Sequence, residues 1–200
     1  MVIVITKLAK STACFFVRNN LVAKEDEEVY AYGMELLLST VFNLLIAIFI
    51  AALTDTFIPC LINLTAFVTI RIYAGGYHAD THLGCMITLI VVQSLFVAII
   101  KMSSVEIFRI SIPFMVLISI VSITVLAPVS HPNKPLSDAL KARLRKKAYI
   151  SMIIWSSFTM AFFVLKNFYI SFCSAYGMIT ISGAMIAEVI KLRREAIEEK

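Results

Sequence analysis

Long apolar stretches constrain this chain more than any other feature of its sequence. A transmembrane helix needs about 20 mostly apolar residues. Five stretches reach or approach that length: Tyr30–Leu53, Gly84–Ile100, Ile110–Val129, Ala148–Leu165 and Tyr169–Ile190. A sixth, Phe57–Ile70, becomes long enough if Tyr73 and Ala74 extend it past Arg71. Because 60% of the 200 residues are hydrophobic and only 16% are charged, a water-soluble fold could not bury this surface. We therefore predict an all-α, polytopic membrane protein with about six transmembrane helices in a single domain, residues 1–200.

The segment before the first span, residues 1–28, has a different pattern. A helix through it separates polar from apolar side chains, with Lys7, Lys10, Ser11 and Arg18 on one face and Ile5, Leu8 and Phe16 on the other. Such a helix lies in the plane of the membrane interface. The lysines interrupt the apolar run, and no small-residue cleavage site follows, so the segment does not read as a signal peptide.

The basic residues decide how the spans are oriented. Lys and Arg in short loops favour the cytoplasmic side. With six spans and both termini inside, fifteen of the eighteen Lys and Arg residues are cytoplasmic, and only Lys101, Arg109 and Lys166 are outside. Six of the fifteen lie in a basic loop, residues 128–147. Pro128, Pro132 and Pro135 prevent a helix from forming at the start of this loop. Beside a membrane, this loop indicates how the spans are oriented and predicts contact with lipid phosphates. It does not indicate nucleic-acid binding.

The segment between the second and third spans, residues 71–85, carries most of the reactive side chains. It holds two of the three histidines, one of the four cysteines and three of the six glycines. One interpretation is a cysteine–histidine nucleophilic site, because a thiol needs a base or a cation to become an effective nucleophile. On one straight helix His78 and Cys85 would stand about 10 Å apart along the axis, too far for proton transfer. The glycines permit the necessary turn, and if Gly84 ends it, Cys85 opens the third span, where the helix dipole favours a thiolate.

Two other interpretations of this segment stay open from the residues alone. His78, His82 and Cys85 follow an i, i+4, i+7 spacing that suits a zinc site, although the H-E-x-x-H pattern is absent and Asp80 would face away on a helix. Alternatively, the histidines and tyrosines anchor the spans at the interface without chemistry. A membrane carrier or metal transporter that uses the three ligands is therefore the alternative to an enzyme.

The other cysteines, Cys14, Cys60 and Cys173, are scattered and form no C-x-x-C pair. We predict no disulfide framework and expect these side chains mainly to fill apolar space.

Six positions in this region, Arg71, Ala74, Gly76, His78, Ala79 and Cys85, resemble the R-x-x-A-x-G-x-H-A-x₅-C signature of the accessory gene regulator B (AgrB) family. The resemblance extends to Ala127-Pro128, to Lys134-Pro135, to the basic run Arg143–Lys147 and to the neighbourhood of Tyr32–Glu35, and so covers nearly the whole chain. Members of that family are membrane-bound cysteine endopeptidases of Gram-positive bacteria. They process the precursors of cyclic quorum-sensing peptides.

The resemblance implies roles for individual residues. His78 is similar in position to the catalytic base and Cys85 to the nucleophile. His82, at a position that the signature leaves open, could rival His78 as base. Arg71, Gly76 and Glu35 are expected to bind the substrate or to support the site. Arg71 could instead contact lipid or mark a helix end, and Glu35 could be a carboxyl at the membrane interface.

The resemblance also implies the substrate and the surroundings. The predicted reaction is cleavage of a short amphipathic precursor similar to AgrD, through an acyl-thioester on Cys85 that is passed on to form a thiolactone. It needs neither a metal nor another cofactor. The predicted location is the bacterial cytoplasmic membrane, with both termini and the active site on the cytoplasmic side. The predicted partners are the precursor and membrane lipids, and a homodimer is plausible.

Overall fold

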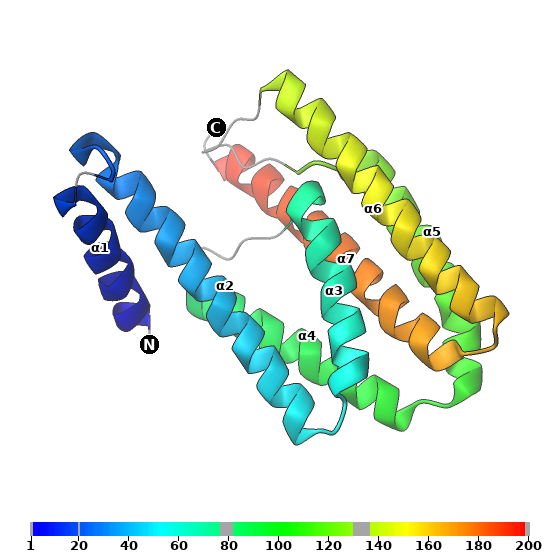
Figure 1. Ribbon diagram of the computed structural model, residues 1–200. Helices are drawn as coiled ribbons and strands as arrows, with labels where there is room; N and C mark the ends of the chain where they lie inside the picture. The colour runs from blue at the N-terminus through cyan, green and yellow to red at the C-terminus, as the bar shows by residue number, and fades with distance from the viewer. Residues whose placement is uncertain (1, 20, 77–81, 130–136, 199–200) are drawn as a thin grey trace. The chain divides into compact units, whose positions relative to one another are not determined.

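The computed structural model describes residues 2–19, 21–76, 82–129 and 137–198, which are almost entirely helical and contain no strand. The elements in chain order are α1 (Val2–Arg18), a short 3₁₀ helix η1 (Lys24–Asp26), α2 (Glu27–Leu53), α3 (Phe57–Ala74), α4 (His82–Met102), α5 (Val105–Leu126), α6 (Asp138–Val164) and α7 (Phe168–Glu198) (Figure 1). Within the described ranges, α2 to α7 give six helices that are long and apolar enough to cross a membrane. The predicted polytopic helical fold is confirmed.

The chain divides into two compact units. The first contains α1, η1, α2 and the beginning of α4, up to Gln93. The second contains α3, the rest of α4, and α5, α6 and α7. Each unit has its own packing, and the predicted site residues are distributed over both.

In the first unit, α1 lies along α2 (Figure 1), and the two helices are in contact. Ala9 and Ala13 are buried at 1% and 0% exposure, and they lie four residues apart on one face of α1. Leu8 and Phe15, by contrast, are 52% and 58% exposed. The N-terminal helix that the sequence predicts is therefore present, and it carries the exposed apolar side chains that an interfacial helix needs.

In the second unit, α7 is the central helix, in contact with α3, α5 and α6. Eight consecutive residues, Ser171–Met178, are buried. Gly177 lies directly against α3, because a Cβ built on it would be 2.5 Å from the carbonyl oxygen of Asn63 and 2.9 Å from Cβ of Ala66. Small residues at such positions let two membrane helices approach closely.

Hydroxyl groups connect the helices of the second unit. The hydroxyls of Thr159 on α6 and Ser174 on α7 are 2.8 Å apart, and Ser171 donates to the carbonyl oxygen of Thr159 at 2.8 Å. The indole N–H of Trp155 on α6 donates to the hydroxyl of Thr69 on α3 at 2.7 Å. Such bonds between helices contribute about 0.6 kcal/mol each on average in a membrane, so they help to specify the packing more than they stabilise it.

The helix α6 begins at Asp138, within the range that the sequence predicts as a basic loop. The hydroxyl of Ser137 caps the helix by accepting from the N–H of Leu140 at 3.4 Å. The basic residues from Lys141 to Lys147 are therefore helical, and Pro128 alone of the three prolines lies within the described residues. Arg145 donates to the carbonyl oxygen of Thr124 at 3.0 Å, so at least one basic side chain binds the last turn of α5.

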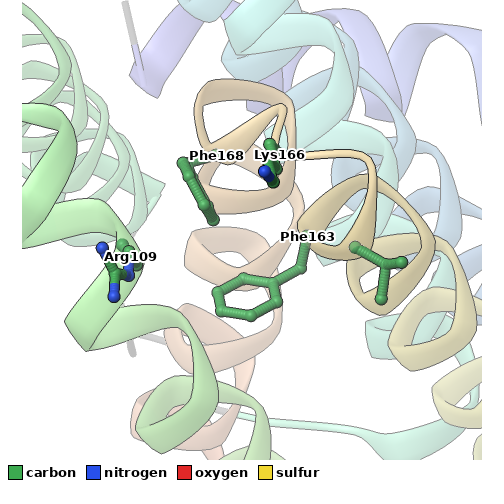
Figure 2. Close-up of a pocket in the computed structure, with 5 residues that line it drawn as sticks. Arg109, Phe163, Lys166 and Phe168 are labelled. Carbon is green, nitrogen blue, oxygen red and sulfur yellow. The ribbon is translucent and has the colours of Figure 1, made fainter.

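A pocket of about 520 Å³ lies where α5 begins, α6 ends and α7 begins, lined by Arg109, Phe163, Val164, Lys166 and Phe168 (Figure 2). The rings of Phe163 and Phe168 meet edge to face, with centroids 5.2 Å apart. Arg109 also pairs with Glu106 at 3.5 Å on the exposed surface. None of the predicted site residues that the structure describes lines this pocket.

Candidate functional site

Cys85 lies in the first turn of α4, which begins at His82. The turn predicted to end at Gly84 thus ends earlier, and Gly84 is itself helical. The first four N–H groups of a helix lack partners inside it, and the helix dipole favours negative charge there. The side chain of Cys85 is partly exposed. The predicted nucleophile therefore stands at the end of the helix that favours an anion, within reach of an external reactant.

The side chain of Asn43 on α2 is a hydrogen-bond partner of this thiol. Its amide N–H donates to Sγ of Cys85 over 3.4 Å. Both residues belong to the first unit, and both are partly buried. A sulfur atom that accepts an N–H donor is better able to carry negative charge, so the contact bears directly on the chemistry of the thiol.

Glu35 occupies the same helix, eight residues before Asn43. Its carboxylate accepts a hydrogen bond from the hydroxyl of Thr6 on α1 at 2.6 Å. At about 1.5 Å per residue, Glu35 and Asn43 are about 12 Å apart along α2. Glu35 thus joins α1 to α2 in this unit.

Arg71 and the glycines after it belong to the second unit. Arg71 lies in the last turn of α3, with its guanidinium 5.4 Å from the centre of the Phe67 ring. The helix ends because Gly75 adopts φ 77° and ψ −153°, a conformation that is essentially restricted to glycine. A Cβ at Gly75 would also stand 2.5 Å from the carbonyl oxygen of Val129. The turn after Arg71 is therefore fixed by both backbone conformation and lack of space.

Gly76 continues this turn against α7. It is buried, with φ 137°, and a Cβ there would meet Cδ1 of Ile181 at 3.2 Å and Cβ of Ala184 at 3.6 Å. One turn further along α7, Glu188 is only 3% exposed. The lack of a side chain at Gly76 therefore lets the end of α3 lie close to α7, and its predicted role in supporting the site stays a prediction.

The predicted base, His78, lies outside the described residues, as does Asp80. Of His82 the structure describes the helical backbone, three residues before Cys85. Among the described residues, no group of three His, Cys, Asp or Glu side chains could hold a metal ion. His78 is not among those residues, so the metal site of His78, His82 and Cys85 stays a prediction.

Two polar residues of potential functional importance did not emerge from the sequence analysis, namely Asn43 and Glu188. Each interrupts an otherwise apolar stretch of its helix. Polar and acidic residues within membrane helices are costly and commonly mark functional sites, and that signal could have identified both. The sequence could not show that Asn43 faces Cys85, since the pairing of α2 with α4 is a tertiary contact.

The fold and this site together define a multi-pass helical membrane protein with a thiol at the end of a span. The model of the family "Accessory gene regulator B" matches residues 7–190, nearly the whole chain. The chain belongs to the accessory gene regulator B family, whose members take part in the processing of the quorum-sensing precursor peptide AgrD. No curated protein and no solved structure gives a significant match.

Proposed function

We propose that this chain is a membrane-embedded cysteine endopeptidase that cleaves an AgrD-like precursor peptide through an acyl-thioester on Cys85. One observation carries the proposal: Cys85 lies partly exposed in the first turn of a membrane-spanning helix, beside a hydrogen-bond donor. A helix N-terminus and a nearby donor both favour the thiolate, which is the reactive form of cysteine.

The proposed reaction has two acyl transfers. His78 takes the proton of Cys85, and Sγ attacks the scissile carbonyl carbon, whose oxygen becomes an oxyanion. When this intermediate collapses, the C–N bond breaks, the amine leaves with a proton from the imidazolium of His78, and a thioester on Cys85 remains. His78, neutral again, takes the proton of a cysteine thiol within the precursor, and the resulting thiolate attacks the thioester. This transfer closes a thiolactone, and the Cys85 sulfur that leaves takes the proton from His78.

The second transfer competes with hydrolysis. Thioester exchange conserves bond energy, whereas hydrolysis is strongly downhill, so a ring forms only if the internal thiol reacts before water does. A thiol held within the same site can reach an effective molarity of about 10⁵ M or more. That advantage is large enough to explain a cyclic product at the membrane surface.

We further propose that the site faces the cytoplasm. The exposed basic side chains at the start of α6 support this orientation through the positive-inside rule. A cysteine introduced at Ala139 should be labelled by an impermeant reagent only from the inside of the cell, and one at Met102 only from the outside. External labelling at position 139 would reverse the topology and remove the cytoplasmic site.

The experiment that tests the proposed chemistry uses a precursor whose internal cysteine is changed to alanine. This precursor should still be cut, and a covalent Cys85–peptide adduct should accumulate and decay slowly to linear product. Intact mass of the full-length protein detects the adduct, with the unmodified precursor as control. Cutting of the alanine precursor at the normal rate, with many turnovers and no adduct, would show that no long-lived thioester forms.

A further inference from the structure

The amide of Asn43 is an unusual group at its position in α2. The residues that follow it up to Leu53 are all apolar. A side-chain amide without a hydrogen-bond partner costs several kcal/mol in an apolar medium, so a membrane helix places one where a partner exists. The partner found here is the sulfur of Cys85, 3.4 Å from Nδ2 and 42 positions away in the sequence.

The same geometry places the donor beside the second atom that becomes charged in the reaction. When Sγ bonds to a carbonyl carbon, the negative charge moves from sulfur to the carbonyl oxygen, which is two bonds away from sulfur. A donor that reaches Sγ before the attack is therefore close to the oxyanion afterwards. A side-chain amide carries two N–H groups, and the structure assigns one of them to Sγ.

We propose that Asn43 is a further catalytic residue, whose amide N–H binds the Cys85 thiolate before the attack and the oxyanion of the tetrahedral intermediate after it. This inference rests on the proposed function. Donors aimed at a developing oxyanion are among the largest contributions to acyl-transfer catalysis, and loss of one typically lowers kcat by about 10²- to 10³-fold. The helix N-terminus at Cys85 acts on the same charge, so Asn43 shares this role with the backbone of α4.

A purely structural role makes different predictions. An amide that only joined α2 to α4 would contribute to helix packing, and its loss would lower thermal stability without changing the chemistry of the thiol. Replacement of Asn43 by Leu, which has a similar volume and no donor, separates the two roles. Asn43→Asp is a second variant of similar shape, and it places a carboxylate next to the sulfur in place of a donor.

The experiment measures Cys85 directly, in full-length protein in which Cys14, Cys60 and Cys173 are alanine. The rate of alkylation by iodoacetamide is followed against pH for the parent, Asn43→Leu, Asn43→Asp and the control Ser39→Ala. Ser39 is buried on α2 one turn before Asn43. We expect the pH midpoint of alkylation to rise in Asn43→Leu, and further in Asn43→Asp, with no change in Ser39→Ala.

Precursor cleavage supplies the second measurement. In Asn43→Leu, kcat should fall by about 10²-fold or more with little change in KM. An unchanged alkylation midpoint in Asn43→Leu overturns the proposal, whether or not activity and thermal stability also fall. The alkylation result does not depend on cleavage. If the parent protein fails to cut any precursor, the proposed function fails whatever the midpoint does, and the oxyanion role fails with it.

Discussion

Cys85 and Cys173 show how differently one kind of side chain is used in two regions of this molecule. Cys85 lies partly exposed in the first turn of α4, next to the amide of Asn43. Cys173 lies in the middle of the buried stretch of α7, at 0% exposure, between serine, alanine and aromatic neighbours. The first environment favours a negative charge on sulfur and leaves the sulfur accessible to reactants, whereas the second favours a small neutral group. The difference teaches that the surroundings of a cysteine, rather than its presence in a membrane span, indicate chemistry.

Loss of the reactive groups should give the largest effect. We expect Cys85→Ala and His78→Ala each to reduce precursor cleavage by at least about 10³-fold, because nucleophile and base act as a unit. Cleavage is measured by the mass of the peptide products, and membrane insertion is checked in the same samples. Cys173→Ala is the matched control and should retain activity. Normal processing by a well-expressed Cys85→Ala protein would remove the distinction between the two cysteines.

Thiol reactivity gives the next largest contrast. In the wild-type protein, Cys85 should react with iodoacetamide about a hundredfold faster or more than Cys60 and Cys173. These two are 1% and 0% exposed, so they can react only when the helices open locally. Peptide mapping by mass spectrometry measures each site separately. Equal rates for Cys85 and Cys173 would mean that α7 is far less enclosed than the structure indicates.

A larger side chain in place of a glycine of α7 should lower stability only where that glycine is packed against another helix. Gly177→Leu places a side chain where a Cβ already meets the Asn63 carbonyl oxygen at 2.5 Å. We expect it to destabilise the protein by about 1–3 kcal/mol or more. Gly183→Ala is the control on the same helix, since a Cβ there meets nothing within 4 Å. The midpoint of thermal unfolding in detergent measures both variants, and equal midpoints would contradict the close α3–α7 contact.

His82 should give the smallest effect. If His78 is the base and no metal is bound, His82→Ala should keep activity within about tenfold of wild type, below the 10²- to 10⁴-fold typical of a lost general base. Chelators should then change nothing. The assay is the precursor cleavage described above, with and without a chelator of transition metals. Loss of activity in His82→Ala together with inhibition by the chelator would favour a metal site made of His78, His82 and Cys85.

The membrane spans could be predicted from the sequence because hydropathy measures the property that inserts them. The prediction that Tyr73 and Ala74 extend the second span is confirmed, since α3 runs from Phe57 to Ala74 and ends at the glycine turn. Hydropathy located the other helix ends less well. The helix α6 begins ten residues before the predicted span, at Asp138, because its first turns are polar and a capping serine, rather than the membrane, starts it.

The site could be predicted only in part, for a related reason. A single sequence identifies reactive residue types and their spacing, and so pointed to Cys85 and to a costly carboxyl at Glu35. It does not reveal which faces of α1, α2 and α4 meet. The hydrogen bonds from Asn43 to Cys85 and from Thr6 to Glu35 depend on those faces, and no pattern within one helix encodes them.

The central position of α7 has a consequence for how the protein is made. In its most apolar stretch 61% of the residues are buried, against 28% or less in the other five spans. A ribosome synthesises α7 after those five, so α3, α5 and α6 enter the bilayer before the helix on which they pack exists. Until then the hydroxyl of Thr159 on α6 lacks its contact with the hydroxyl of Ser174 on α7. The second unit can therefore assemble only after α7 has been translated. The earlier helices then pack against the buried small residues of α7.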